Sequence, residues 1–281
     1  MRVCRTIAEI RNFVRECRAA GQTVGLVPTM GYFHEGHLTL MREAKKSCDA
    51  VVVSLYINPL QFGPKEDFAE YPRDFDRDAA MAREVGVDAI FAPPDEEMYP
   101  EGFCTYVEVT GITGRLCGLS RPGHFRGVTT VVSKLFNIVR PDRAFFGQKD
   151  AQQAMVIQRM VQDLNMDLEV VVLPTVREED GLAMSSRNVY LSVEQRRNAT
   201  VLYRSLCAFR EAVERGERDA GKLRRLMVEM ISSTPGAEVD YVEILSVPFL
   251  EPLEKLRGRC IAALAVRFGK TRLIDNTIVE V

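Results

Sequence analysis

The chain has 281 residues, of which 46% are hydrophobic and 27% charged, and its formal net charge is −2. This composition predicts a soluble globular protein of one large or two smaller domains. It excludes the clustered basic surface that nucleic-acid binding needs, and the apolar runs are too short for a transmembrane helix.

The N-terminal segment MRVCRTIAEIRNFVREC lacks the apolar core of a signal peptide, and its Glu residues are atypical of a transit peptide. Seven cysteines are scattered through the chain without a CxxC pair, and their number is odd. They are expected to be reduced, buried or partly buried thiols, which indicates a cytoplasmic protein.

The first part of the chain alternates strand and helix patterns. A capping box of Thr6 and Glu9 opens the first predicted helix, which ends before Gly21. Hydrophobic periodicity then predicts the remaining elements. In chain order they are strand 24–29, helix 37–47, strand 51–57, helix 74–85, strand 89–93, strand 105–109, helix 128–139, strand 144–146, a helix opened by Asp150, and strand 168–173.

The pattern changes after Arg177. A polar loop is followed by a helix from Ser192 to about Gly216, with Ser192 and Gln195 as a second capping box, and by a helix over 220–232. Strand patterns follow at 239–245, 260–268 and 273–281. We therefore predict an α/β fold: a Rossmann-like, doubly wound parallel sheet over residues 1–176 and a smaller α+β domain over 177–281.

In a parallel sheet the loops that follow the strands gather at one edge, where α/β proteins place their binding sites. Three polar loops follow predicted strands: VPTMGYFHEGHL at 27–38, the loop at Asn58–Gln61, and Gly147–Asp150. We expect these loops to share a cleft.

The 27–38 segment places His34 and His37 at a predicted helix start. It resembles a P-loop in glycine spacing, but His37 and Leu38 replace the Lys and Ser/Thr, and no GxGxxG fingerprint is present. Imidazoles so placed can donate a hydrogen bond or a positive charge to a phosphoryl oxygen. A capping or surface pair is the structural alternative, and no nearby Cys or third His completes a metal site.

Further polar groups fit phosphate chemistry. Lys149, beside Asp150, can supply a point charge, and Ser185, Ser186 and Arg187 can bind polyphosphate oxygens. A solvated lysine and a polar linker are the alternative interpretations. Two glutamines can bind a carboxylate or hydroxyl, and two aspartates of the 74–85 helix can bind magnesium or remain solvated; these residues are Gln61, Gln153, Asp76 and Asp78.

These residues resemble those of one family, the pantothenate synthetases or pantoate–β-alanine ligases. Five segments match in order and span essentially the whole chain: PTMGYFHEGH, INPLQFGPKEDFAEYPRD, RPGHFRGVTTVV with RPDRAFFGQKDAQQ, PTVREEDGLAMSSRNVYL, and TRLIDN. HxGH alone would indicate only the wider nucleotidyltransferase superfamily.

The resemblance implies a cytoplasmic homodimer with a C-terminal lid domain. It implies ATP-dependent condensation of (R)-pantoate with β-alanine through a pantoyl adenylate, giving pantothenate, AMP and pyrophosphate in pantothenate and coenzyme A biosynthesis. Mg²⁺ is expected with ATP.

By position, the resemblance also assigns site residues. Catalytic residues would be His34, His37, Lys149 and Arg187. Gln61 and Gln153 would bind pantoate, and Gln61 also β-alanine. The ATP-binding set would be Met30, Gly31, Tyr32, Phe33, His34, Glu35, Gly36, His37, Gly147, Gln148, Lys149, Asp150, Val176, Met184, Ser185, Ser186 and Arg187.

The chain departs from the family pattern at two positions. Gln148 stands where a glutamate is common, and Met184 where a lysine occurs. The first change removes one carboxylate near the expected magnesium, so we assign no protein ligands to the metal. Two alternative functions are compatible with the sequence. One is a nucleotidyltransferase that makes a stable nucleotide conjugate, and the other is a nucleotide-binding regulator without catalytic turnover.

Overall fold

The computed structural model describes residues 1–64 and 66–281 and divides into two compact units. The first unit comprises residues 1–110, 121–147 and 153–174, and the second comprises 111–120, 148–152 and 175–281. The predicted boundary after residue 176 lies close to the start of the second unit's long C-terminal segment. Two short earlier segments also cluster with that unit.

The first unit contains a six-stranded parallel sheet in the order β1-β4-β3-β2-β5-β6. Its central strands form because their runs of Val, Leu and Ala are buried on both faces. The strands are β1 (Arg2–Cys4), β2 (Val24–Thr29), β3 (Ala50–Leu55), β4 (Ala89–Phe91), β5 (Arg143–Gly147) and β6 (Glu169–Leu173).

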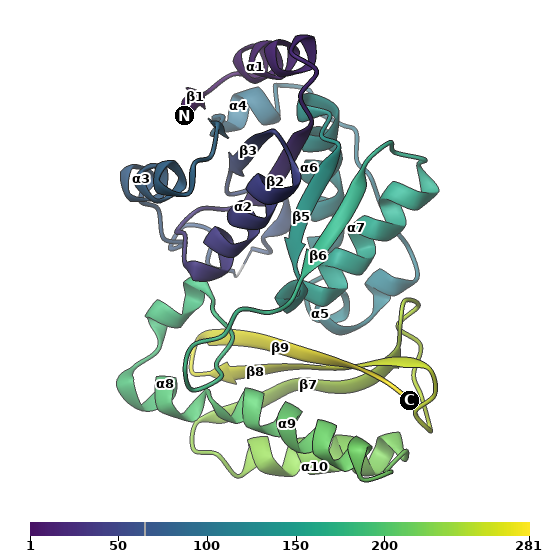
Figure 1. Ribbon diagram of the computed structural model, residues 1–281. Coiled ribbons are helices and arrows are strands. Elements are labelled where there is room, and N and C mark those ends of the chain that lie inside the picture. The colour runs from purple at the N-terminus through teal and green to yellow at the C-terminus, as the bar shows by residue number, and fades with distance from the viewer. Residues whose placement is uncertain (65) are drawn as a thin grey trace. The chain divides into compact units, whose positions relative to one another are not determined.

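Helices cover both faces of this sheet, as Figure 1 shows with α2 in front of the strands and α6 behind them. On one face α2 packs against α3, and on the other α1 packs against α6. The helices of more than one turn are α1 (Ile7–Ala19), α2 (Glu35–Ser47), α3 (Phe75–Val85), α6 (His124–Val139) and α7 (Ala151–Asp163), which begins in the second unit. The predicted doubly wound α/β fold is confirmed.

The second unit is built on an antiparallel sheet of three strands in the order β7-β8-β9. Helices α9 and α10 lie side by side against it (Figure 1), and their apolar faces share one core with β8. The elements are α8 (Val193–Asn198), α9 (Val201–Glu214), α10 (Ala220–Ser232), β7 (Ala237–Ser246), β8 (Arg259–Phe268) and β9 (Thr271–Glu280).

Several predicted boundaries were wrong. Helix α2 begins at Glu35 rather than at residue 37, because His34 is its N-cap, and α6 begins at His124. The helix predicted over 192–216 is two helices, since the Thr200 hydroxyl donates to the Arg197 carbonyl at 2.8 Å and competes with the helical bonds. Both predicted capping boxes form.

The predicted strand at 105–109 does not form. The Val107 N–H donates to the Thr130 hydroxyl at 3.0 Å, and the Val107 carbonyl accepts from Thr129 at 2.5 Å. The segment therefore bonds to side chains of α6 instead of to a strand. The sequence patterns also missed β1 and several short elements, among them α4 (Asp95–Met98), α5 (Leu116–Ser120) and η1 (Pro59–Gln61).

The seven cysteines are free thiols. Six are buried or partly buried as predicted, whereas Cys104 is exposed. It lies in the extended segment that follows α4, outside the sheet.

Candidate active site

The loop between β2 and α2 bends sharply before its histidines. Gly31 and Tyr32 both have positive φ, +88° and +51°. A Cβ on Gly31 would lie 3.0 Å from the Asp78 carboxylate and 3.2 Å from the Leu55 side chain. This position requires glycine, because it combines a left-handed backbone with a close approach.

The two histidines cap α2 reciprocally. The Gly36 N–H donates to His34 Nδ1 at 3.1 Å, and the His34 N–H donates to His37 Nδ1 at 3.3 Å. Their ring centroids are 4.1 Å apart. The two histidines thus form the capping pair that the sequence offered as an alternative. Their caps fix which ring nitrogen of each histidine can carry a proton.

An Nδ1 atom that accepts a backbone N–H carries no proton, so each neutral ring has its proton on Nε2. His34 and His37 are therefore arranged as Nε2–H donors beside the positive end of α2. A fully charged imidazolium would place a second hydrogen on Nδ1, facing the N–H that it caps. The capping geometry favours neutral hydrogen-bond donors over the charged form that the sequence also allowed.

The other residues of this loop differ in what their side chains can contact. Phe33 is fully buried in the core, with its ring 5.5 Å from that of His37, so its side chain is not available to a ligand. Glu35 is exposed and pairs with Arg42. Met30, Gly31 and Tyr32 line a groove of about 380 Å³ whose lining does not include either histidine.

The Asn58–Gln61 loop meets the histidine loop, as predicted from the parallel sheet. Gln61 Nε2 contacts Met30 Sδ at 2.9 Å, and Asn58 Nδ2 donates to Gln61 Oε1 at 3.3 Å. Gln61 is 9% exposed. Gln153, the second glutamine assigned to pantoate, is half-buried and makes no side-chain hydrogen bond to a described residue.

The RPGHFRG segment, whose role the sequence did not reveal, orients Gln61. The Gln61 carbonyl accepts hydrogen bonds from His124 Nδ1 at 2.8 Å and from Arg121 at 3.4 Å. Arg121 also donates to His124 Nε2 at 3.1 Å and pairs with Glu66 at 2.6 Å. Burial acts to raise the pKa of Glu66, but Arg121, the Gly63 backbone and His124 together lower that pKa below its ordinary value.

Asp76 and Asp78, the two candidate magnesium ligands, have different environments. Asp76 is exposed, whereas Asp78 is 1% exposed and both of its oxygens accept backbone N–H groups, so it is not the solvated residue that the helix pattern suggested. Among the described residues, no group of three or more His, Cys, Asp and Glu could hold a metal ion.

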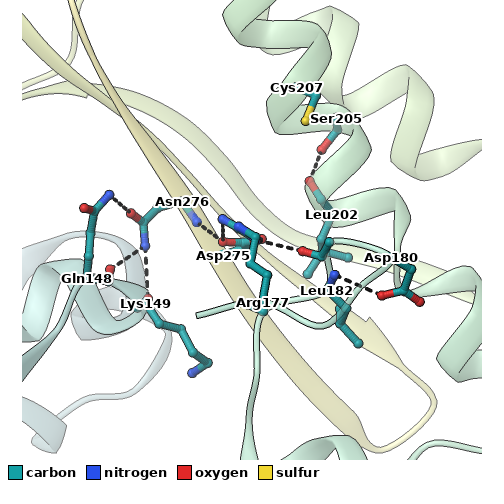
Figure 2. Close-up of polar contacts among 12 residues, drawn as sticks. Gln148, Lys149, Arg177, Asp180, Leu182, Leu202, Ser205, Cys207, Asp275 and Asn276 are labelled. Carbon is teal, nitrogen blue, oxygen red and sulfur yellow. Dashed lines mark hydrogen bonds and ion pairs between the residues drawn. The ribbon is translucent and has the colours of Figure 1, made fainter. Parts of the chain in front are cut away.

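In the second unit, β9 orients the loop that carries Lys149 (Figure 2). Asn276 Nδ2 donates to the carbonyls of Gln148 and Lys149 at 2.8 and 3.0 Å. The Lys149 ammonium lies 3.5 Å from the Asp150 carboxylate. This explains why TRLIDN, distant in sequence, belongs with the candidate site residues.

The neighbouring Asp275 orients the polar loop in the same way. Arg177 donates to both Asp275 oxygens, at 2.6 and 2.9 Å, and to the Gly181 carbonyl at 3.0 Å (Figure 2). The Met184 N–H then donates to the Val176 carbonyl at 3.0 Å. These bonds close the loop that presents Ser185, Ser186 and Arg187.

Ser185, Ser186 and Arg187 begin a short 3-10 helix, η4 (Ser186–Tyr190). The Ser185 hydroxyl caps it by accepting the Arg187 N–H at 3.2 Å. Ser186 is buried, and Ser185 and Arg187 are half-buried. The predicted phosphate-binding residues thus fall in two places, the histidine loop in the first unit and the Lys149 and Ser185–Arg187 loops in the second.

A larger groove of the first unit lies away from these residues. It has a volume of about 820 Å³, and Arg11, Arg15, Arg18 and Arg140 line it. Arg18 is committed to Asp142 at 2.7 Å and to the Arg140 carbonyl. This groove lies where β5 and β6 begin, opposite the edge at which parallel sheets bind ligands.

Comparison with known proteins agrees with this arrangement. A family model described as pantoate-beta-alanine ligase matches residues 2–278. A protein named pantothenate synthetase from Pelotomaculum thermopropionicum is 66% identical over 278 residues, which cover 99% of each chain.

Solved structures give the same result. The pantothenate synthetase of Thermus thermophilus has a TM-score of 0.93 and 50% identity, covering 99% of each chain. A pantoate-beta-alanine ligase of Francisella tularensis, solved in complex with beta-gamma ATP and beta-alanine, has a TM-score of 0.80 and 33% identity, covering 99% of this chain and 97% of the other.

Proposed function

Because the chain belongs to the pantoate–β-alanine ligase family, we propose that it joins (R)-pantoate to β-alanine with ATP, as the last step that makes pantothenate. In the first half-reaction a pantoate carboxylate oxygen attacks the α-phosphorus of ATP, and pyrophosphate leaves. In the second, the β-alanine amine attacks the acyl carbon of pantoyl adenylate, an amide forms, and AMP and a proton leave. The observation that carries this proposal is the pair of Nδ1 caps at the start of α2, which leaves Nε2 as the donor atom of each neutral ring.

We assign the protein's part in the first half-reaction to charge stabilisation and positioning. Negative charge builds on the phosphoryl oxygens as pyrophosphate departs, and donors already in place stabilise it without reorganisation. His37 and His34 would donate from Nε2, while Lys149 and Arg187 would contribute positive charge. No residue of this set has to act as a nucleophile.

The remaining residues are proposed to bind substrates. Gln61 and Gln153 would bind pantoate, and Gln61 also β-alanine. The nucleotide would contact the 30–37 and 147–150 loops, Val176 and the 184–187 loop. The division at residue 176, with the second part acting as a lid, belongs to the same proposal.

We propose that Mg²⁺ enters as its complex with ATP, with phosphate oxygens among its ligands. Asp78 does not fit a ligand role, because both of its oxygens accept backbone N–H groups. Bound Mg²⁺ would neutralise phosphate charge, and no step above depends on a protein ligand to it. A homodimer and a cytoplasmic location are proposed on the family resemblance; no helix among the described residues is long and apolar enough to cross a membrane.

Two substitutions of His37 test the donor role, because they separate its two ring nitrogens. His37→Asn keeps an oxygen near the Nδ1 position, which can cap the His34 N–H, but it removes the Nε2–H donor. His37→Gln keeps an N–H near the Nε2 position and loses the cap. We expect His37→Asn to slow single-turnover pyrophosphate release on the order of 10²–10³-fold, and His37→Gln to be less impaired.

The assay contains ATP, Mg²⁺, pantoate and β-alanine, and it identifies the nucleotide product. AMP with stoichiometric pyrophosphate is expected. ADP would contradict adenylation, whereas pyrophosphate without free AMP would indicate a nucleotidyltransferase, and ATP binding without pyrophosphate release a regulator. A wild-type rate for His37→Asn would overturn the donor role.

A further inference from the structure

The dipeptide Arg77–Asp78 of α3 contacts the loop that precedes His34. The Tyr32 N–H donates to Asp78 Oδ2 at 2.6 Å, and the Phe33 N–H donates to Asp78 Oδ1 at 2.7 Å. Each carboxylate oxygen therefore binds one of two consecutive peptide groups. Charge-assisted bonds of this kind are stronger than neutral ones, and the side chain is 1% exposed.

Arg77 donates a hydrogen bond to the same loop, whereas Asp78 accepts hydrogen bonds from it. Its Nη2 donates to the Phe33 carbonyl at 2.8 Å, and its guanidinium lies 4.9 Å from the centroid of the Tyr32 ring. Arg77 Nη1 also contacts Asp78 Oδ1 at 3.4 Å. Adjacent side chains on one helix thus bind both the N–H and the C=O of Phe33.

The contacted loop needs such support. Tyr32 has φ = +51°, a left-handed conformation that is strained for a non-glycine residue. The next residue, Phe33, packs its ring 5.5 Å from His37, and the residue after it is the N-cap. Any relaxation at Tyr32 would therefore move both histidines.

Fold stability alone does not account for the buried carboxylate. Burial raises the pKa of Asp78, and the two backbone N–H groups and the Arg77 charge only partly oppose that rise. Asp74 adds to the rise as a nearby like charge. A charge whose desolvation is incompletely offset adds little to the free energy of folding.

We propose that Asp78, assisted by Arg77, is a positioning residue for adenylation, which fixes the Tyr32–Phe33 peptide groups and thereby aims His34 and His37 at the phosphates of ATP. This inference rests on the donor role proposed for His37. Asp78 acts through the loop and touches no substrate. Displacement of a catalytic group by about 1 Å is enough to cost on the order of 10²-fold in rate.

The test is a double-mutant cycle on single-turnover pyrophosphate release, with Asp78→Asn and His37→Asn. Asn has nearly the shape of Asp, but its amide group turns a donor toward one of the two N–H groups. We expect Asp78→Asn alone to lower the rate on the order of 10–10²-fold. In the His37→Asn background the same change should cost only a few-fold, because one of the two groups that it positions is absent and only His34 remains to be displaced.

A matched control is Glu84→Gln, which removes a carboxylate charge from an exposed position six residues later on α3. It should leave the rate and its ATP dependence unchanged. A wild-type rate for Asp78→Asn would overturn the proposal, and so would an equal cost in both backgrounds, which is the result of general destabilisation. A wild-type rate for His37→Asn alone would reject the donor role, and with it the action of Asp78 through that ring.

Arg77→Met covers the case in which Asp78→Asn does not fold. The Arg77 side chain is 41% exposed, so the fold should tolerate this change. It removes the bond to the Phe33 carbonyl and keeps an apolar stem over Tyr32. We expect a several-fold fall in the single-turnover rate at saturating ATP, and a smaller fall in the His37→Asn background; an unchanged rate would count against the proposal.

Discussion

At the scale of single residues, the candidate site depends on side-chain hydrogen bonds that hydrophobic periodicity in the sequence does not predict. The Nδ1 caps decide that His34 and His37 present Nε2–H groups. The sequence predicted both histidines but left their protonation open. It offered Asp78 only as a magnesium ligand or a solvated charge, and it assigned no role to Arg121 or His124. The loop residues that these three side chains bind lie 45 to 63 residues away along the chain.

Gly127 is another residue whose role appears only in three dimensions. A Cβ at this position in α6 would overlap the Leu60 carbonyl and approach the Gln61 nitrogen to 2.6 Å. Asn58 Nδ2 also donates to the Gly127 carbonyl at 3.0 Å. The helix can approach the Gln61 loop this closely only because residue 127 has no side chain.

We therefore expect Gly127→Ala to lower the free energy of unfolding by roughly 1–3 kcal/mol, because backbone atoms cannot yield as a side chain tip can. It should also raise the KM for pantoate by displacing Gln61. Urea unfolding and steady-state kinetics would measure both. Gly114→Ala is the control, since a Cβ there meets nothing within 4 Å; equal costs for the two would refute the packing argument.

At the scale of elements, an ion pair connects the 177–190 loop to β9. Arg177 binds Asp275 with two bonds, and its guanidinium also lies 4.5 Å from the centroid of the Tyr203 ring on α9. Asp275 is 2% exposed. Removing one partner of such a pair leaves an uncompensated buried charge, which is far costlier than removing both.

Arg177→Met should accordingly destabilise the protein by about 3–5 kcal/mol, and Arg177→Met/Asp275→Asn should recover part of that loss. Urea titrations of the three proteins would measure this. Arg215→Met, which breaks an exposed pair with Glu211 on α9, should cost less than about 1 kcal/mol. A double mutant less stable than the single would show that the buried charge is not the cause.

At the scale of the whole molecule, 37 basic and 39 acidic residues nearly balance, so net charge contributes little to acid unfolding near neutral pH. The pH dependence comes instead from carboxylates with perturbed pKa values. Glu66 has a pKa lowered by Arg121, so its ionised form stabilises the folded state. That contribution is complete above the unfolded pKa of about 4.3 and is lost as the pH falls through the lower folded value.

Glu66→Gln should thus be less stable than the wild type at pH 7, and the difference should shrink as the pH is lowered below about 4.3. Urea unfolding at several pH values between 7 and 3 would show the convergence. Glu84→Gln removes an exposed carboxylate of α3 and should track the wild type throughout. A difference for Glu66→Gln that stays constant down to pH 3 would contradict the linkage.

The sequence by itself determined what depends on neighbours along the chain: the alternation of strands and helices, two capping boxes, and the motifs that identify the family. Periodicity within a segment sets which face is buried, and parallel strands bring their following loops to one edge. Prediction from the sequence failed at 105–109, because this segment bonds to side chains of α6 instead of to a strand. It also failed at 199–200, where a local side-chain bond interrupts a helix.

Only the tertiary structure decided how the candidate site residues are oriented. A buried carboxylate on α3, a glycine on α6 and an Asp-Asn pair on β9 each act on loops far away in sequence. Their effect depends on hydrogen-bond distances and close approaches, which are specified when separate elements pack and not by the local pattern of any one of them.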